Sequence, residues 1–322
     1  MRLRLARAGA VARVPEPLYR VRPPAGPSTD RHFEYLMHEH RDRQAELETV
    51  FTEHLRRTGA WLPPPAAPLP PTGEFPVLAS VVIPVRNRAR TIGEAVESAA
   101  SQRVDFPFNV LVVDNHSTDG TGAVVEAARR RHAYVHRLVP PLPGRGIGGC
   151  WGLAVESPLC GRYAVQLDSD DLYAGPDTLQ RMVEGLRAGG AALAVGSYRL
   201  VDRDLNELPP GVIDHREWTP ANGHNNLLRV EGIGAPRAYH VPALRRVGFP
   251  DVSYGEDYAA ALGLSRIWPV ARIFEPVYLC RRWEGNTDSG LTSLQQALHH
   301  EYKDYVRTLE LAARRKMAGS EE

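Results

Sequence analysis

Hydrophobic and polar positions follow two alternating patterns through most of the chain. Short runs rich in β-branched residues are typical of buried strands, and longer stretches with an apolar residue every three or four positions are typical of helices. The predicted strands are residues 80–85, 109–113, 134–139, 163–167 and 192–198, and the predicted helices are residues 91–102, 121–131, 149–156 and 176–188. This alternation predicts an α/β fold, in which a mainly parallel sheet carries helices on both faces. Ligands bind such sheets at the carboxyl ends of the strands, so we expect functional residues there.

The first quarter of the chain has a different pattern. Residues 32–57 place apolar side chains at helical spacing among many charges, which predicts an amphipathic helix or two in a helical N-terminal extension over residues 1–62. Residues 63–76 then hold seven prolines in fourteen positions. Because proline fixes φ and lacks an N–H donor, we expect a stiff linker. Residues 77–322 form the main domain, which we expect to end in a helix.

The N-terminal extension also repeats a later part of the sequence. Residues 3–22 align with residues 262–281 at a constant offset of 259, with ten identities in twenty positions. One interpretation is a chance similarity between two Arg-rich amphipathic segments. The other is that residues 1–62 correspond to the tail of a preceding copy of the same domain.

Composition and charge exclude several classes of protein. With 39 Lys and Arg against 38 Asp and Glu, the chain lacks the basic excess of a nucleic-acid-binding protein. Its longest mostly apolar stretch, residues 76–85, is shorter than the roughly 20 residues of a transmembrane helix. The three cysteines, Cys150, Cys160 and Cys280, are odd in number and form no C-x-x-C pair, which is typical of a reducing compartment. We therefore expect a cytoplasmic protein, with peripheral attachment to a membrane left open.

An acidic cluster follows the predicted strand at residues 163–167. Asp168, Ser169, Asp170 and Asp171 place three carboxylates within four residues. Such groups repel one another, and a divalent cation relieves the repulsion. Mg²⁺ and Mn²⁺ suit hard carboxylate oxygens. The alternative is an acidic turn or helix cap without a metal.

Two further segments carry candidate ligand contacts. Asp114 is the first residue after the strand at residues 109–113, where a carboxylate can accept a hydrogen bond from a base or ribose. Residues 143–149 form a glycine-rich loop before a helix, which lets the backbone approach a phosphate. The loop matches neither a dinucleotide-binding fingerprint nor a P-loop, and its Arg145 could meet a diphosphate or simply be solvated.

A pair of carboxylates precedes the apolar helical stretch at residues 258–267. Glu256 and Asp257 are adjacent there. One of them could cap the helix, since acidic side chains are favoured at that end. The other then remains available as a general base.

Taken in order, these motifs resemble those of the family 2 glycosyltransferases. The resemblance spans about residues 75–283, and the segments that carry it are residues 80–102, 110–121, 163–173 and 247–259. It implies a GT-A fold with a Rossmann-like sheet. It also implies a metal-dependent, inverting transfer of a sugar from a nucleoside diphosphate sugar to an acceptor hydroxyl, with Mn²⁺ or Mg²⁺ as cofactor. A UDP-sugar is the favoured donor and a GDP-sugar the alternative. The acceptor could be a sugar, a lipid-linked molecule or a small molecule.

The resemblance also implies a role for each matching residue. Asp114 corresponds to the nucleoside-contacting aspartate. Asp168 and Asp170 form the D-x-D motif, with Asp170 the more direct metal ligand and Asp168 nearer the ribose. Asp257 falls at the position of the general base, beside Glu256. The expected donor-binding residues are Pro84, Val85, Arg86, Asn87, Asp114, Arg145, Asp168 and Ser169.

Some positions depart from the family pattern. Arg86 stands where the family often has an aromatic residue, so stacking on the base would fall to Arg86 or be lost. Trp151 and Gly152 replace an arginine-asparagine pair. Arg282 and Trp283 resemble the R-W pair of processive members, but Leu279 replaces their glutamine, so we do not infer polymer synthesis. The expected acceptor contacts are Trp218, Arg282 and Trp283, and the candidates for a third metal ligand are His215, His224, His240, His299 and His300.

Two other functions stay open at this stage. A nucleotidyltransferase also uses metal-bound carboxylates beside an α/β sheet, and it would release pyrophosphate. A non-catalytic sugar-nucleotide-binding module would explain the departures at Arg86 and Trp151. The sequence does not indicate an oligomeric state.

Overall fold

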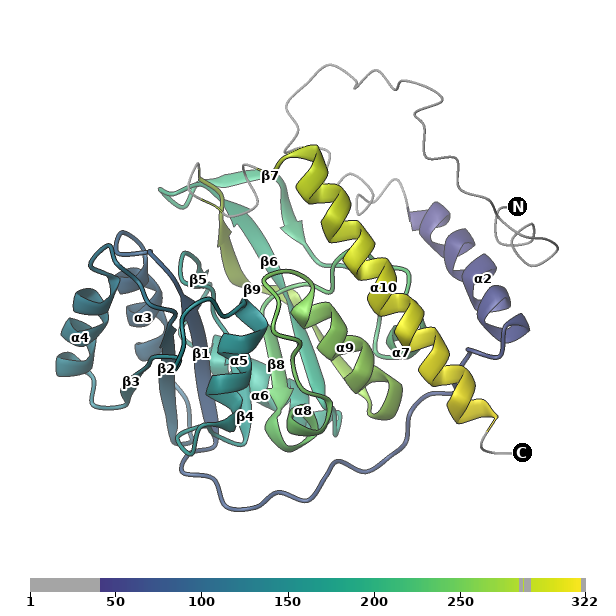
Figure 1. Cartoon of the computed structure of the whole chain (residues 1–322), viewed down its shortest axis with the longest axis horizontal. Coiled ribbons are helices and arrows are strands. Elements are labelled where there is room, and N and C mark those ends of the chain that lie inside the picture. The colour runs from purple at the N-terminus through teal and green to yellow at the C-terminus, as the bar shows by residue number, and fades with distance from the viewer. Residues whose placement is uncertain (1–40, 284–285, 287–290, 320–322) are drawn as a thin grey trace.

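The structure is a computed structural model that describes residues 41–283, 286 and 291–319 (Figure 1). The repeated segment at residues 3–22 lies outside these residues. The strands are β1 (Ala79–Val85), β2 (Phe108–Asp114), β3 (Val135–Leu138), β4 (Tyr163–Gln166), β5 (Leu172–Tyr173), β6 (Leu193–Val201), β7 (Glu207–Ile213), β8 (Arg237–His240) and β9 (Val270–Arg281). The helices are α2 (Arg41–Arg57), α3 (Ile92–Ala100), α4 (Thr121–Arg131), α5 (Ile147–Glu156), α6 (Thr178–Ala188), α7 (Gly223–Asn226), α8 (Val241–Val247), α9 (Glu256–Ile267) and α10 (Ser293–Ala318).

The strands form a sheet in the order β3-β2-β1-β4-β8-β6-β9-β5, with β7 paired to β6. Strands β1 to β4 pair in parallel, as does β6 with β9. Strand β8 is antiparallel to both of its neighbours, and β5 and β7 also pair antiparallel. The predicted α/β fold is confirmed. All five predicted strands are present, as β1, β2, β3, β4 and β6, whereas the pattern did not predict the antiparallel additions.

The core consists of two hydrophobic layers, one on each face of the sheet. Alternate residues of β1 face opposite layers: Val81 and Ile83 lie in one, and Val82 lies in the other. Helices α3, α4 and α6 cover the first face, and α5, α8 and α9 cover the second. This alternation is the period of two that a sheet buried on both faces requires.

The helical extension and the proline-rich stretch pack against the domain. Leu55 of α2 is fully buried in the same layer as α9. Leu62 exchanges backbone hydrogen bonds with the side chain of Asn225, at 3.2 and 2.8 Å. Residues 63–76 contain neither helix nor strand, as expected for a run of prolines, and Trp268 Nε1 donates to the carbonyl of Pro68 at 3.0 Å.

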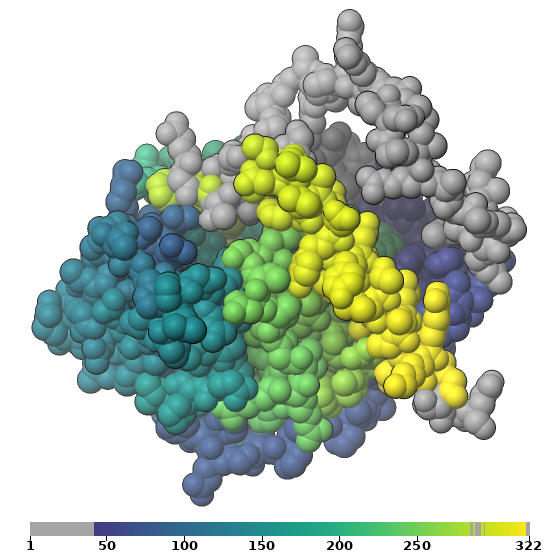
Figure 2. Space-filling view, viewed as in Figure 1, coloured from purple at the N-terminus to yellow at the C-terminus, as the bar shows by residue number. Residues whose placement is uncertain are grey.

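Helix α10 begins at a capping box. The side chain of Thr292 accepts from the N–H of Gln295 at 3.2 Å, and the Gln295 side chain accepts from the Thr292 N–H at 2.9 Å. The helix runs diagonally over α9 (Figure 2). In the part of the chain that the structure describes, neither α10 nor any other helix combines the length and the apolar character needed to cross a membrane.

Candidate functional site

Most of the predicted site residues gather at one edge of the sheet. Strands β1, β2 and β4 are parallel neighbours, so their carboxyl ends meet there. The antiparallel strand β8 begins where β4 ends, and the N–H of Arg237 donates to Gln166 Oε1 at 3.2 Å. The segment after β4, the start of β8 and the start of α9 therefore lie close together.

Asp168 is held at the end of β4 by one side-chain donor and one side-chain acceptor. Gln166 Nε2 donates to both of its carboxylate oxygens, at 2.9 and 3.0 Å. The Asp168 N–H bonds to the hydroxyl of Tyr278 on β9 at 3.0 Å. Burial raises the pKa of Asp168, and the charge of Arg237 opposes this rise. Asp168 is thus a carboxylate held in a fixed position, and the charge of Arg237 offsets part of its own.

The other two acids of the cluster have different surroundings. Asp171 is buried and accepts from the N–H of Arg281 at 2.8 Å, so it anchors the loop to β9. Burial, followed by the charges of Asp168 and Asp170, raises the pKa of Asp171 well above its ordinary value. Asp170 receives a hydrogen bond from Asn286 at 3.2 Å and lies 3.8 Å from the guanidinium of Arg88. Asp170 is therefore the member that reaches the two loops around the site.

The donor set fits a divalent cation in kind. Asp168 and Asp170 provide hard oxygens, and their mutual repulsion is what a cation would relieve. Within residues 41–283, 286 and 291–319, no three His, Cys, Asp or Glu side chains group so as to hold a metal by themselves. Water or substrate phosphate would have to complete the coordination, as is usual for Mg²⁺. Among the same described residues, none of the candidate third ligands belongs to such a group. These candidates are His215, His224, His240, His299 and His300.

Glu256 and Asp257 form the first turn of α9, after Gly255 in the left-handed conformation at φ +77°. Asp257 Oδ2 lies 2.9 Å from Arg237 Nη1, and Asp257 Oδ1 accepts from the N–H of Tyr258 at 2.7 Å. The Asp257 side chain is 24% exposed. Glu256 is 6% exposed, and burial together with the charge of Asp257 raises its pKa to about 8. Asp257 is the carboxylate that a hydroxyl can reach.

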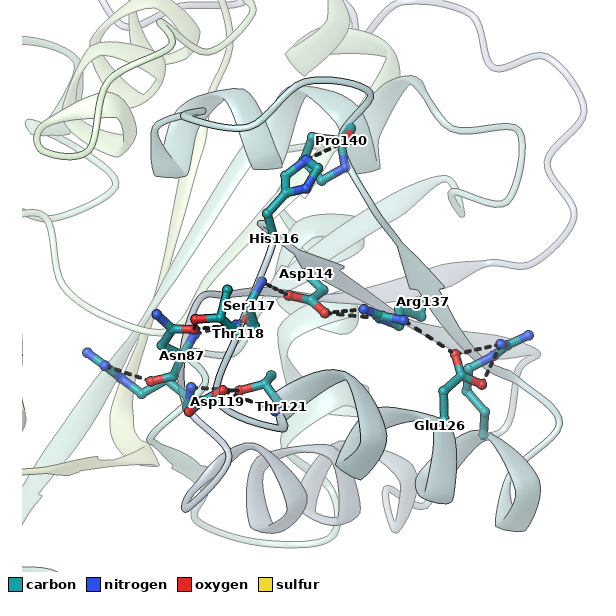
Figure 3. Close-up of polar contacts among 12 residues, drawn as sticks. Asn87, Asp114, His116, Ser117, Thr118, Asp119, Thr121, Glu126, Arg137 and Pro140 are labelled. Atoms are coloured by element: carbon teal, nitrogen blue, oxygen red, sulfur yellow. Dashed lines mark hydrogen bonds and ion pairs between the residues drawn. The ribbon is translucent and has the colours of Figure 1, made fainter.

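Asp114 is fully buried, and both of its oxygens are engaged by the protein (Figure 3). Oδ1 accepts from the N–H of Ser117 at 2.9 Å, and Oδ2 accepts from Arg137 at 3.0 and 2.6 Å. Burial would raise the pKa of Asp114, but these hydrogen bonds and the charge of Arg137 lower it. In this structure Asp114 stabilises the end of β2.

The next residue, Asn115, has a side-chain oxygen that, unlike those of Asp114, accepts no hydrogen bond from the described residues. It is 7% exposed, and its Nδ2 donates to the carbonyl of Arg145 at 2.7 Å. Only the amide nitrogen can make that bond, so the orientation of the amide is fixed. Its Oδ1 is then a buried acceptor without a partner among the described residues. The motif comparison missed Asn115. A buried, unpaired acceptor is costly unless a ligand supplies a donor.

The segment after β1 is largely occupied in joining two loops (Figure 3). Asn87 adopts φ +53°; its N–H donates to Ser117 Oγ at 2.9 Å, and its Oδ1 accepts from the N–H of Thr118 at 2.8 Å. Pro84 and Val85 lie within β1. Arg86 and Asn87 are both exposed, and because the Asn87 side chain binds Thr118, Arg86 is the more available to a ligand.

Packing accounts for Gly146 and Gly148 in the loop at residues 143–149. A Cβ on Gly148 would lie 1.9 Å from the carbonyl oxygen of Pro250, and one on Gly146 would lie 2.3 Å from the backbone of Val252. The N–H of Gly146 donates to Asp251 Oδ1 at 2.7 Å, and that of Gly148 donates to the Val252 carbonyl at 3.0 Å. Arg145 pairs with Asp251 at 3.2 Å. The loop supports the segment that leads to Glu256.

Trp218 is a core residue, which corrects its expected role as an acceptor contact. Its side chain is fully buried, its Nε1 donates to the carbonyl of Ile233 at 3.2 Å, and the guanidinium of Arg272 lies 4.1 Å from its ring centroid. A large aromatic surface gains more from this burial than from exposure in a loop. Trp151 is likewise buried, against Tyr239 and Phe249.

Trp283 lies next to the acidic cluster. Its N–H donates to Asn286 Oδ1 at 2.6 Å, and Asn286 in turn donates to Asp170. The guanidinium groups of Arg90 and Arg203 lie 6.0 and 5.8 Å from its ring centroid. Arg282 continues from β9, where its N–H donates to the Val201 carbonyl at 2.7 Å. The Arg282-Trp283 pair therefore borders the site.

Comparison with known sequences identifies related proteins. The chain is 37% identical over 127 residues to the succinoglycan biosynthesis protein ExoO of Rhizobium meliloti, covering 39% of this chain and 35% of that protein. It is 33% identical over 108 residues to the undecaprenyl-phosphate 4-deoxy-4-formamido-L-arabinose transferase of Sodalis glossinidius, covering 33% of this chain and 32% of that protein. The chain thus spans about a third of the length of these two relatives.

Solved structures share the fold. A crystal structure of residues 1–349 of S. aureus TarS with UDP-GlcNAc superposes with a TM-score of 0.57 at 20% identity, covering 72% of this chain and 66% of that one. The mannosyltransferase PcManGT of Pyrobaculum calidifontis, in complex with GDP-Man and Mn²⁺, gives a TM-score of 0.50 at 19% identity, covering 86% and 84%. At these identities the likeness concerns the fold.

A family model matches more than half of the chain. The sequence model of the family described as "Glycosyl transferase family 2" matches residues 80–249, which is just over half of the 322 residues. This range contains β2, β4, the acidic cluster and all but the first residue of β1. The chain therefore belongs to glycosyl transferase family 2 and has a GT-A fold.

Proposed function

We propose that the protein is a metal-dependent, inverting glycosyltransferase that moves a sugar from a nucleoside diphosphate sugar to an acceptor hydroxyl. The observation that carries the proposal is the meeting of Asp168 and Asp257 around Arg237 at the carboxyl end of β4. This arrangement supports a metal-binding role for Asp168 and the role of base for Asp257. Family membership favours sugar transfer over nucleotidyl transfer and over a purely binding role.

The residues divide the chemistry between two sides of the site. Asp170, with Asp168, would hold Mn²⁺ or Mg²⁺, which neutralises negative charge on the leaving diphosphate when bound. Asp257 accepts the proton of the attacking hydroxyl, and attack from the face opposite the leaving group inverts the anomeric carbon. Glu256 stays protonated at neutral pH, because its pKa lies near 8, and so it does not compete as the base. The PcManGT structure contains Mn²⁺, which supports the choice of metal.

For the nucleotide we propose a UDP-sugar, with a GDP-sugar as the alternative. Uracil and guanine each present a ring N–H, and the unpaired Oδ1 of Asn115 can accept it. Asp114, the preceding residue, fixes the end of β2 through its bonds to Ser117 and Arg137. TarS was solved with UDP-GlcNAc and PcManGT with GDP-Man, so the fold accommodates both nucleotides.

For the acceptor we propose a sugar, lipid-linked or small-molecule hydroxyl that enters beside Trp283. The S. glossinidius relative is named for an undecaprenyl-phosphate transfer, which supports including lipid-linked acceptors. We place the protein in the cytoplasm, with peripheral contact to a membrane when the acceptor is lipid-linked.

Binding and turnover test the proposal separately. Calorimetric titration of UDP and of GDP, with and without Mn²⁺, should show tighter binding with the metal in wild type and in the exposed-site control Glu301→Gln. Asp170→Ala should lose this metal dependence. Asp257→Asn should bind the nucleotide normally but turn over UDP-GlcNAc, UDP-glucose and GDP-mannose at least about 100-fold more slowly. Metal-independent binding in wild type, or wild-type turnover in folded Asp257→Asn, would overturn the proposal.

A further inference from the structure

Arg237 is a largely buried cation that the sequence motifs do not single out. It is the first residue of β8, and its side chain is 15% exposed. Its Nη1 contacts Asp257 Oδ2 at 2.9 Å and also donates to the carbonyl of Gly234 at 3.0 Å. The guanidinium is thus held by one charged and one neutral acceptor.

A second set of contacts joins Arg237 to the acidic segment after β4. Its N–H donates to Gln166 Oε1 at 3.2 Å, and Gln166 Nε2 donates to both oxygens of Asp168. These bonds use the Gln166 oxygen as acceptor and its nitrogen as donor, so they fix the amide orientation. A continuous hydrogen-bonded path therefore runs from Asp168 through Gln166 and Arg237 to Asp257.

The charges around Arg237 come from three elements. Asp257 and Glu256 belong to α9, Asp168 follows β4, and the phenol of Tyr239 lies on β8 itself. Burial would lower the pKa of Arg237, but these groups raise it, so the guanidinium stays charged. One cation thus faces three carboxyl groups from both sides of the site.

We propose that Arg237 is the positioning residue for the general base: it holds the Asp257 carboxylate toward the end of β4 and ties that position to Asp168. The inference rests on the proposed role of Asp257 as base. Oδ1 of Asp257 already accepts from the N–H of Tyr258, so without Arg237 the carboxylate would lose the partner that holds Oδ2 toward the end of β4 and would turn further into the first turn of α9, where acidic side chains bind well. Arginine suits the task because its planar fork binds two acceptors at once, which a lysine ammonium does less well.

Chemical rescue and a separation of kcat from binding test this role. Turnover of UDP-GlcNAc, UDP-glucose and GDP-mannose with Mn²⁺ is measured for wild type, Arg237→Ala and Arg237→Lys, and UDP and GDP binding is measured by calorimetry. Arg237→Ala should lower kcat about 100-fold while the nucleotide Kd changes less than about threefold, because a misplaced catalytic group costs rate rather than donor binding. Added guanidinium should restore at least about a tenth of the lost rate. The kcat of Arg237→Lys should lie between those of wild type and Arg237→Ala.

Arg272 provides the matched control. It is also a partly buried arginine, and it donates to the backbone carbonyls of His215 and Asp214. Its guanidinium stacks on the Trp218 ring, whereas that of Arg237 contacts the Asp257 carboxylate. Arg272→Ala should lower stability without changing kcat, and guanidinium should not raise its rate. A kcat for Arg237→Ala within about threefold of wild type would overturn the inference, as would an equal loss of nucleotide binding or no recovery with guanidinium. If Arg237→Ala fails to fold, Arg237→Lys carries the test, with kcat lowered about tenfold at unchanged Kd.

Crystallography tests the inference independently of turnover. If wild type uses none of the three donors, the proposed function fails for them, but the position of Asp257 can still be compared. Asp257 should turn away from the end of β4 in Arg237→Ala or Arg237→Lys and should stay in place in Arg272→Ala. An unmoved Asp257 in the Arg237 variants would overturn the inference.

Discussion

Replacing Glu256 by glutamine should change how stability depends on pH. Glu256 is 6% exposed at the start of α9, and burial with the charge of Asp257 raises its pKa to about 8. In the unfolded chain the same group ionises with an ordinary pKa near 4.5. Between these values the folded protein keeps a proton that the unfolded chain releases, so the free energy of unfolding falls as pH rises.

The size of the effect follows from that interval. Each pH unit inside it costs wild type up to about 1.4 kcal/mol, and the loss between pH 5 and pH 8 reaches about 3 kcal/mol. Glutamine has nearly the same shape but no titrating proton, so Glu256→Gln should lack this loss. The variant should therefore gain on wild type by up to about 3 kcal/mol as the pH rises from 5 to 8.

Urea unfolding at pH 5, 6, 7 and 8, followed by tryptophan fluorescence, measures the difference. The experiment uses EDTA and no nucleotide, because bound ligands would add their own stabilisation. Glu301→Gln, on the exposed face of α10, is the control and should follow wild type at every pH. If Glu256→Gln and wild type keep a constant difference across this range, Glu256 is not a protonated group in the folded protein.

Three other substitutions test the structural roles assigned above. Gly148→Ala should lower stability by about 2 kcal/mol in thermal unfolding and reduce turnover, because its Cβ would meet the Pro250 carbonyl at 1.9 Å. Its control is Gly152→Ala in the same helix, where a Cβ has nothing within 4 Å; this variant should be neutral or stabilising in the same assay. Trp218→Ala should cost about 3–5 kcal/mol in urea unfolding while leaving the acceptor KM unchanged, and a raised KM with unaltered stability would restore its role as an acceptor contact. Arg137→Gln should cost about 3 kcal/mol, since it leaves the buried Asp114 carboxylate without its ion pair. Its control is the exposed Arg130→Gln, and equal melting temperatures for the two variants would contradict the role given to Asp114.

The parts of the fold that follow from local pattern were predictable. The strands β1, β2 and β4 are runs of four to seven residues that are almost wholly buried, so their sequences show no polar alternation to confuse the pattern. Strand β8 was not predictable, because four residues that begin with an arginine carry no strand signal. Its place is set by pairing with β4 and β6, which are distant in sequence.

The candidate site shows the same division. Asp168, Asp170 and Asp257 were found from motifs whose spacing is local, whereas Arg237 joins them only through antiparallel pairing. Asn115 could have been noticed as the polar residue directly after Asp114, but its free oxygen depends on the distant Arg145 carbonyl. A glycine-rich sequence such as residues 143–149 is the same whether its glycines approach a phosphate or a neighbouring loop. Only the packing of Gly146 and Gly148 against residues 250–252 distinguishes these two roles.

The burial of Leu55 and Ala60 changes what counts as the folding unit. Both are fully buried in the hydrophobic layer that also contains Tyr258 and Leu264 of α9. The proline-rich stretch marks a boundary in the sequence, but the cooperative unit continues across it. A fragment that starts at residue 77 would leave part of this layer facing water, and the helix that carries Asp257 would open first to hydrogen exchange. We therefore expect the extension to help set the rigidity of the proposed base, Asp257, through the shared hydrophobic layer.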